Sequence, residues 1–222
     1  MILFLLTAYG RREVVFFTLF WGVAAVLAWQ LHPAASAVPI LALFFTLSFF
    51  RDPVRRAPPG EETLVAPADG RITDVSDIAA GGDLPEPSIR VGIFLSVFDV
   101  HVNRTPCAGV VKSTRYTKGE FLDARHPECA KRNERNDILI ERTAAKDQVL
   151  VRQISGAIAR RIVCAIREND VVEKGQRVGM IKFGSRTELY VPSRSLAEVT
   201  VKVGDRVKGG ETIIARTRAS GT

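Results

Sequence analysis

The chain has 222 residues and a formal net charge of +7, enough for one sizeable domain with an appendage and too few for two ordinary domains. Its three cysteines are widely spaced, and its three histidines form no pair at metal-ligand spacing. The sequence therefore argues against a disulfide framework, a cysteine-based zinc site and a catalytic metal, and a reducing compartment fits best.

The charge is unevenly distributed along the chain. Arg11, Arg12 and Glu13 are the only charged side chains before position 51, so residues 1–50 carry +1 and residues 51–222 carry +6. A basic domain is typical of proteins that meet nucleic acid, an anionic membrane surface or an acidic ligand. A solvated surface with surplus arginine has the same net charge, so charge alone does not choose among these.

Residues 14–31 and 34–50 are two uncharged, mostly apolar runs separated by a His-Pro break. A membrane-spanning helix needs about 20 apolar residues and can manage with about 17. We therefore predict a transmembrane helical hairpin over residues 1–50. Arginines precede and follow the hairpin but are absent from its turn, so the positive-inside rule places both ends in the cytoplasm. The predicted location is the cell (inner) membrane, with the following domain on the cytoplasmic face.

Two other interpretations of this segment remain open. The runs could form a buried hairpin of a soluble protein, since the second run is short and contains Pro39. Residues 34–37 also resemble the small-residue cleavage site of a secretory signal. A second apolar run directly after that site favours retention in the membrane over release.

The rest of the chain is predicted to be mainly β. Residues 51–62 contain three prolines and read as a stiff linker, and residues 63–222 form the predicted β-rich domain. Short β-branched runs with glycine turns between them favour an all-β sandwich or barrel, and one possible helical turn lies at 125–135. Residues 170–179 resemble residues 202–210, a pattern similar to the barrel-sandwich hybrids of lipoyl and biotinyl carriers. The predicted strands lie within residues 64–75, 88–97, 148–166, 176–184, 188–192 and 197–216.

Three short stretches could carry chemistry, and each has an ordinary structural interpretation. Asp69 lies in a Pro-Ala-Asp-Gly turn, where it could simply satisfy backbone geometry. Asp99 and His101 are two apart, so in an extended segment the carboxylate would lie beside the imidazole and orient it as an acid or base, although a solvated strand end is equally consistent. Gly184 and Ser185 could be no more than a turn.

In this order, the three stretches resemble the short form of the phosphatidylserine decarboxylases. The resemblance covers almost the whole chain, and the joint order of its motifs is more specific than any one of them. Besides the apolar hairpin, it rests on residues 49–53, 67–70, 96–104, 118–121, 132–136 and 183–186.

The resemblance implies a proenzyme that cuts itself between Gly184 and Ser185 into residues 1–184 and 185–222, which stay associated. Ser185 then becomes a pyruvoyl group, the cofactor that condenses with the amine of phosphatidylserine and accepts electrons as CO₂ leaves to give phosphatidylethanolamine. Asp69 matches an aspartate that assists cleavage, and His101 a histidine that handles the substrate. Arg104 stands where longer members have a second histidine that acts as the cleavage base. Arginine cannot take a proton at neutral pH, so His101 is a candidate for both steps.

Further expectations are less specific. Arg104 and Arg186 are candidates to bind the substrate phosphate, and Asp99 to orient His101. We expect an anionic membrane surface, and not nucleic acid, as the partner. Two rival functions have sequence support: a carrier domain modified on Lys182, and a membrane-tethered β module that binds anionic lipid or nucleic acid without catalysis.

Overall fold

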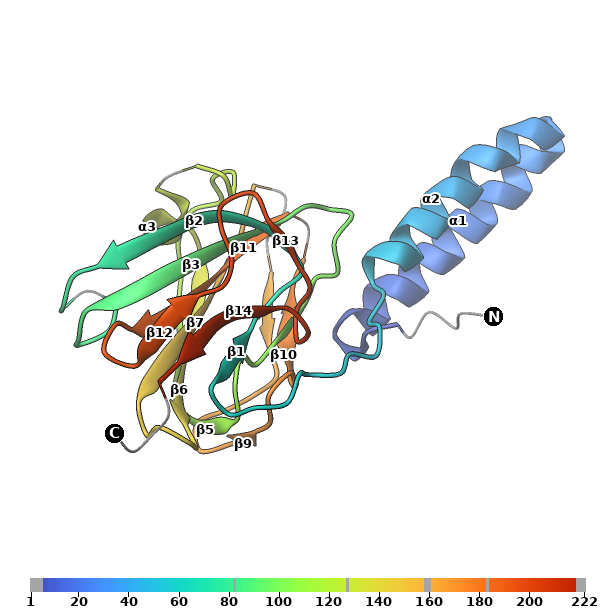
Figure 1. Ribbon diagram of the computed structural model, residues 1–222. Coiled ribbons are helices and arrows are strands. Elements are labelled where there is room, and N and C mark those ends of the chain that lie inside the picture. Colours follow the sequence, from blue (N-terminus) through green and yellow to red (C-terminus); the bar gives the residue numbers. More distant parts are fainter. Residues whose placement is uncertain (1–5, 82, 127, 158–160, 183, 219–222) are drawn as a thin grey trace. The chain divides into compact units, whose positions relative to one another are not determined.

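A computed structural model describes residues 6–81, 83–126, 128–157, 161–182 and 184–218. The chain divides into two compact units, Met1–Val54 and Arg55–Thr222. The first unit is helical and the second is built mainly of strands (Figure 1). The division falls within the predicted linker, residues 51–62. A mainly β fold behind an apolar N-terminal helix is thus confirmed.

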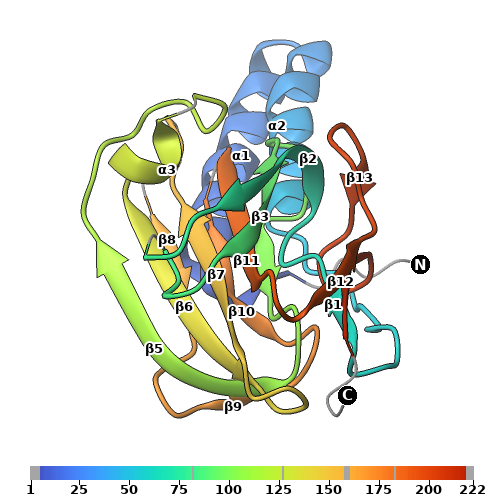
Figure 2. The ribbon, with the colours of Figure 1, turned by 60° about the vertical axis from the view of Figure 1, so that its left-hand side comes forward.

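The helical unit is a hairpin. A short 3-10 helix, η1 (Ala8–Gly10), leads into α1 (Arg11–Leu31), and a second one, η2 (Pro33–Ser36), leads into α2 (Ala37–Phe49). The helices run side by side (Figure 1, Figure 2). His32 ends α1, and its Nδ1 accepts a hydrogen bond from the N–H of Ala34 (3.2 Å), which fixes the reversal. No residue of α1 is fully buried within the protein, and many of its apolar side chains, such as Phe16, Leu19 and Trp29, are exposed.

The two helices differ in length. With 21 residues, α1 is about 32 Å long at 1.5 Å per residue, which matches a hydrocarbon core of about 30 Å. With 13 residues, α2 is about 20 Å long. Within the described residues, only the segment Ala8–Leu31 is long and apolar enough to cross a membrane. The predicted hairpin is present, but its second helix is shorter than the apolar run suggested.

The β unit consists of short strands and one short helix, α3 (Cys129–Arg132), which lies inside the predicted helical turn. The strands are β1 (Thr63–Val65), β2 (Gly70–Ile78), β3 (Ser88–Leu95), β4 (Val102–Arg104), β5 (Gly109–Thr117), β6 (Arg135–Arg142), β7 (Gln148–Ile154), β8 (Ile162–Cys164), β9 (Val171–Val172), β10 (Arg177–Ile181), β11 (Ser185–Pro192), β12 (Leu196–Val199), β13 (Arg206–Val207) and β14 (Ile213–Thr217).

In the described part of the chain these strands form one large sheet and two small ones. The large sheet has eight strands in the order β13-β2-β3-β11-β7-β6-β5-β9, and the small sheets have the orders β1-β14-β12 and β4-β10-β8. The large sheet curls into a half-barrel (Figure 2). Its inner side chains, such as Ile93, Ile140 and Leu189, are fully buried and pack with Leu64 and Ile214 of the β1-β14-β12 sheet. Burial of this shared apolar layer holds the sheets together.

Strand β11 is central to the large sheet. It pairs with β3 from Ser185↔Leu95 to Pro192↔Ser88 and with β7 from Arg186↔Ile154 to Tyr190↔Leu150. Because successive side chains of a strand point to opposite faces, Ser185 and Thr187 share the inner face with Leu189. Arg186, Glu188 and Tyr190 share the outer face, where they are nevertheless buried or nearly so.

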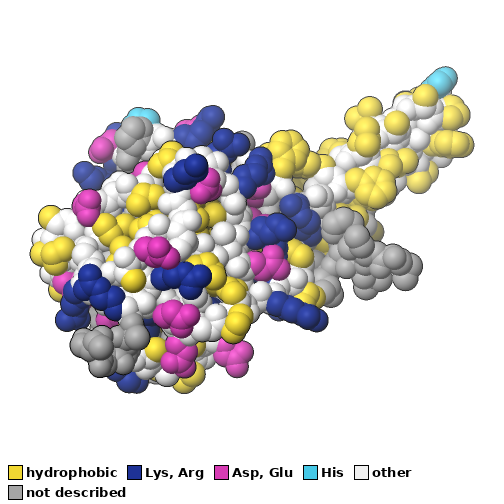
Figure 3. Space-filling view, in the orientation of Figure 1, with side chains coloured by type: hydrophobic (Ala, Val, Ile, Leu, Met, Phe, Trp, Pro, Cys, Tyr) yellow, Lys and Arg dark blue, Asp and Glu magenta, His cyan; other side chains and the backbone are white. Residues whose placement is uncertain are grey.

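The two units differ in surface character. Acidic and basic side chains are interspersed over the β unit on the face shown in Figure 3, whereas the helical unit is apolar. On this face the positive charge is spread out, which differs from the continuous basic stripe typical of a nucleic-acid-binding domain.

Candidate active site

Ser185 is the first residue of β11, and its side chain is fully buried. Its hydroxyl oxygen has no hydrogen-bond partner among the described residues. Most buried polar atoms are hydrogen-bonded, so an exception requires an explanation. A hydroxyl that is kept out of water and free of other bonds remains available to react with a neighbouring group.

The carbonyl next to this hydroxyl belongs to Gly184. Gly184 has a φ of +65°, in the left-handed region that glycine adopts without a steric cost. Gly156 approaches it so closely that a Cβ at position 156 would clash with the Gly184 carbonyl oxygen. The Gly184–Ser185 peptide is therefore held between a left-handed turn and a strand that is paired on both sides.

His101 is completely buried and lies against the same peptide. The Gly184 N–H points at Nε2 of the ring (3.4 Å), and the other ring nitrogen, Nδ1, lies 2.9 Å from the carbonyl oxygen of Asp99. Because a backbone N–H only donates and a carbonyl only accepts, Nδ1 carries the proton and the Nε2 lone pair faces Gly184. The ring is therefore in the tautomer that a base at Gly184–Ser185 requires.

The Asp99 carboxylate does not lie beside this ring, which corrects the predicted pairing. The segment after β3 is a turn, so the alternation expected of an extended strand does not apply. Oδ2 of Asp99 accepts hydrogen bonds from the backbone N–H and the hydroxyl of Ser96 (2.8 and 2.7 Å). Asp99 orients His101 through its backbone carbonyl.

Asp69 is held in its turn by two groups of the β unit. Its Oδ2 pairs with Arg55 (2.8 Å), and its Oδ1 accepts a hydrogen bond from the Gly209 N–H (2.7 Å). It directly precedes β2, which is separated from β11 by β3. At about 4.8 Å per strand, the two backbones lie about 10 Å apart.

Arg104 contacts two glycine turns of the β unit. Arg104 ends β4 three residues after His101, a distance of about 10 Å along an extended strand. Its guanidinium donates to the Gly175 carbonyl (3.0 Å), and its side chain fills the space beside Gly210. Gly175 and Gly210 lie close to each other there. They belong to the two turns, within residues 170–179 and 202–210, whose sequences resemble one another.

Arg186 is adjacent to Ser185 in sequence but lies on the opposite face of β11. Its guanidinium binds Asp74 (2.5 Å) and Glu188 (2.8 Å), and the side chain is only 11% exposed. With two carboxylates already bound, it is not placed to receive a phosphate. The predicted phosphate-binding role of Arg186 is thus at odds with its contacts.

An open groove reaches Gly184 from the outer side of the sheet. It has a volume of about 270 Å³ and is lined by Phe94, Ser96, Val97, Asp123, Ala124, Arg125, Ala157 and Gly184. A space of this size suits a small polar group such as an amino acid, and it is smaller than most pockets for drug-sized ligands.

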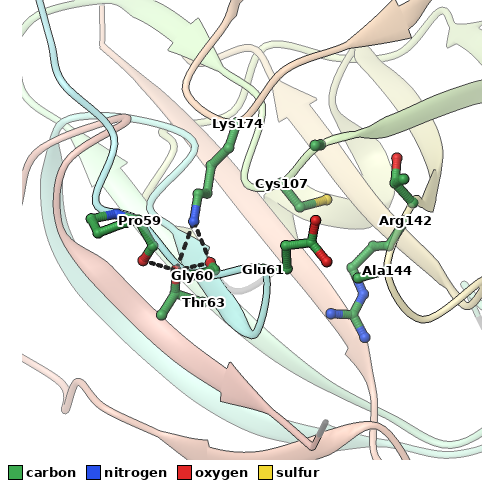
Figure 4. Close-up of a pocket in the computed structure, with 10 residues that line it drawn as sticks. Pro59, Gly60, Glu61, Thr63, Cys107, Arg142, Ala144 and Lys174 are labelled. Carbon is green, nitrogen blue, oxygen red and sulfur yellow. Dashed lines mark hydrogen bonds between the residues drawn. The ribbon is translucent and has the colours of Figure 1, made fainter. Parts of the chain in front are cut away.

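A second pocket, of about 140 Å³, lies elsewhere (Figure 4). It is lined by residues around Cys107, Arg142 and Lys174, and none of the predicted site residues is among them. Lys174 donates to the Gly60 carbonyl and the Thr63 hydroxyl (2.6 and 2.8 Å), as the dashed lines in Figure 4 show. Burial raises the pKa of Cys107 to about 12, so its thiol is unreactive at neutral pH.

Comparison with known proteins gives a single result. The family profile described as phosphatidylserine decarboxylase matches residues 41–215. A phosphatidylserine decarboxylase proenzyme from Syntrophus aciditrophicus is 43% identical over 90% of this chain and 94% of its own length. The proenzymes from Carboxydothermus hydrogenoformans and Solibacter usitatus are 42% and 45% identical over 92% and 87% of this chain, and over 95% and 89% of their own lengths. The chain belongs to the phosphatidylserine decarboxylase family.

Membership of the decarboxylase family excludes the carrier alternative, and so does the position of Lys182. Its side chain is only 6% exposed, and its backbone N–H donates to the Arg161 carbonyl (3.2 Å). A carrier lysine has to reach a separate enzyme, so it has to stand exposed on its turn.

Several residues around the decarboxylase site were not predicted. Asn103 donates to the Thr187 hydroxyl (3.3 Å) and accepts from Gln153 (2.9 Å), so buried amides tie β4 to the inner face of β11. Ser155 follows β7 beside Ser185, and its buried hydroxyl also has no described partner. Gly156 carries no local sequence signal, because its importance comes from a carbonyl 28 positions later in the chain.

The packing of Gly156 against the Gly184 carbonyl gives a testable prediction for the decarboxylase. Gly156→Ala adds a methyl group where that carbonyl oxygen lies, so Gly184 has to move. If the chain cuts itself between Gly184 and Ser185, as the sequence predicts, the variant should be cut more slowly than the wild type. The measurement is the time course of cleavage on denaturing gels after cell-free synthesis.

Gly109→Ala is the matched control for this variant. A Cβ at position 109 would clash with the Glu141 carbonyl oxygen in the same way, but at the β5-β6 pairing and away from Ser185. Equal slowing in both variants would attribute the effect to general destabilisation and contradict a specific role for Gly156.

Proposed function

We propose that this chain is a proenzyme that cuts itself between Gly184 and Ser185, and that the mature enzyme decarboxylates phosphatidylserine to phosphatidylethanolamine with a pyruvoyl group made from Ser185. Family membership supports the overall reaction. The observation that carries the finer proposal is the buried, unpartnered Ser185 hydroxyl beside a left-handed Gly184, with the Nε2 lone pair of His101 facing that glycine.

Self-cleavage would begin with an acyl shift. The Ser185 hydroxyl oxygen attacks the Gly184 carbonyl carbon, the peptide C–N bond breaks, and the released amine takes up the proton that His101 has removed from the hydroxyl. Loss of the Ser185 Cα proton then expels the Gly184 carboxylate and leaves dehydroalanine. Its imine tautomer takes up water and releases ammonia, which yields the pyruvoyl group.

The residues around Ser185 fit such a group. The position is buried and Ser185 Oγ has no described partner, so conversion of the side chain breaks no hydrogen bond. A pyruvoyl group here would supply an electron sink for the electrons left when CO₂ departs. His101 holds a proton-accepting nitrogen at this position, and the carbonyl of Asp99 keeps its ring in place. Asp69, clamped by Arg55 and Gly209, is assigned an indirect part in cleavage.

The groove at Gly184 supports entry of a phospholipid head group. Its volume of about 270 Å³ accommodates a serine but not two acyl chains, so the chains of a bound lipid would stay in the bilayer. An anionic membrane surface is therefore the proposed partner of the β unit, which carries most of the net positive charge. The apolar helix α1 would retain the protein at the cell (inner) membrane.

The two mature chains, residues 1–184 and 185–222, would remain associated. Strand β11 of the small chain pairs with β3 and β7, β13 pairs with β2, and β14 pairs with β1, so three of its strands are bonded to strands of the large chain. Isolated two-stranded pieces are marginally stable in water, and the small chain would leave its apolar side chains exposed if it dissociated.

Substitution of Ser185 tests the proposed function. Ser185→Ala removes the nucleophile, so the protein should remain one uncut chain without decarboxylase activity. Ser185→Cys should still be cut, because a thiol can make the same acyl shift. Denaturing gels and release of CO₂ from labelled phosphatidylserine give both readouts. Decarboxylation by an uncut Ser185→Ala protein would refute the proposal and leave a non-pyruvoyl mechanism.

His101 has a separate prediction. His101→Ala removes the group that exchanges protons at the site, so turnover by whatever fraction is cut should fall by about 10²-fold or more. His126→Ala is the control, because that ring is exposed and caps a local turn through Glu128. Wild-type turnover by a fully cut His101→Ala enzyme would remove His101 from the mechanism.

The proposed orientation predicts which positions can be labelled from outside the cell. Val203 is 61% exposed on the β unit, and Ala35 is exposed in the turn of the hairpin. With both flanks of the hairpin cytoplasmic, an impermeant maleimide should label Ala35→Cys in intact cells but Val203→Cys only after permeabilisation. Labelling of Val203→Cys in intact cells would place the β unit outside.

A further inference from the structure

The guanidinium of Arg186 makes three hydrogen bonds directly beside the proposed cleavage site. It donates to the hydroxyl of Thr73 (2.8 Å), to Oδ1 of Asp74 (2.5 Å) and to Oε1 of Glu188 (2.8 Å). Thr73 and Asp74 lie on β2, whereas Arg186 and Glu188 lie on β11. The side chain therefore reaches across β3, the strand between them.

The carboxylates that hold Arg186 have further partners. Asp74 also accepts from Arg90 (2.6 Å), and Glu188, which is fully buried, accepts from the hydroxyl of Tyr190 (2.7 Å). Burial alone would raise the pKa of Asp74, but Arg186 and Arg90 outweigh it and hold that pKa below its usual value. Asp74 is thus an ionised member of a hydrogen-bonded network, and removal of the Arg186 charge would leave it without one of its two arginines.

The backbone of β3 leaves room for this network. Gly92 lies between the two strands, and a Cβ at that position would clash with the Asp74 carboxylate and the Arg186 guanidinium. Because Gly92 has no Cβ, the side chain of Arg186 can cross β3. The path of the Arg186 side chain across β3 depends on residues from three strands. An accidental ion pair at the surface would not need such an arrangement.

Chain ends are poorly ordered unless something holds them. If the Gly184–Ser185 bond is cut, residue 185 becomes the end of the small chain, and Arg186 is the first residue behind it. The partners of Arg186 on β2 belong to the large chain. Its bonds would therefore span the break between the chains and persist after it.

We propose that Arg186 is a positioning residue that fixes the new N-terminus of the small chain, and with it the pyruvoyl group, in the site of the mature enzyme; this rests on the proposed self-cleavage. Arg186 does not touch the reacting atoms, because its side chain lies on the opposite face of β11 from Ser185. Its role is to keep the end of β11 paired with β3 and β7.

Arg186→Met tests this role, and Arg142→Met is the control. Arg142 is also a buried arginine, bound to Asp147 (2.6 Å) and Thr217 (2.8 Å), but it ends β6, which β7 separates from β11. Amide hydrogen exchange of residues 185–192 is measured in the full-length, cleaved proteins, together with kcat and KM.

We expect the Arg186→Met protein to be cut. The amides of residues 185–192 should then exchange about tenfold faster or more, which corresponds to a loss of about 1.4 kcal/mol in local stability. The kcat should fall about tenfold or more, with little change in KM. Arg142→Met should exchange these amides at the wild-type rate. Arg186→Lys keeps the charge but not the planar, forked guanidinium. Its exchange rates and kcat should lie between those of the wild type and of Arg186→Met. If Arg186→Met does not fold, Thr73→Val should give a smaller shift in the same direction, because it removes one of the three guanidinium bonds together with the Thr73–Gly92 hydrogen bond (3.2 Å).

Three results would count against the inference. Wild-type exchange in a cleaved Arg186→Met protein, or in Thr73→Val where Arg186→Met does not fold, would overturn it while leaving the proposed function intact. Equal acceleration in the Arg142→Met control would reduce Arg186 to a general contribution to stability. An uncut but active wild-type protein would overturn both the proposed function and this inference.

Discussion

The double pairing of β11 is the constraint on which the rest of the site depends. Its first residue, Ser185, is bonded into a sheet between β3 and β7, while the residue before it, Gly184, adopts a left-handed backbone. The peptide between them is therefore fixed on one side by a sheet and bent on the other. A cut at this point removes no strand from the sheet, which explains how one chain could become two without loss of the fold.

Burial at this peptide keeps the reacting groups together and keeps water away from them. The Ser185 hydroxyl is shielded from water, and the ring of His101 is oriented by two backbone groups, the Asp99 carbonyl and the Gly184 N–H. Orientation by backbone atoms does not depend on a neighbouring carboxylate. It also means that substitution of the Asp99 side chain would leave the carbonyl that orients the ring.

The sequence predicted much of the fold and the residues at its centre, but not how they contact one another. Alternating apolar runs and glycine turns indicated a β-sandwich, and the family resemblance indicated Ser185 and His101. Strands β5 and β6 were not predicted, because Gly109, Asn136 and Arg142 occupy buried positions of these strands and interrupt the alternation of apolar and polar residues. The Asp99 carboxylate binds Ser96 because a turn replaces the expected strand. The Arg104 side chain lies at the two glycine turns, and its phosphate-binding role stays a prediction.

The central claim is that the active protein consists of two chains, the smaller of which begins with a carbonyl group derived from Ser185. Mass spectrometry of the purified, active enzyme under denaturing conditions tests this directly. The account predicts one chain ending at Gly184 and one with the mass of residues 185–222 in which pyruvoyl replaces the serine and no free amino terminus remains. An active preparation with the mass of the intact chain would contradict it.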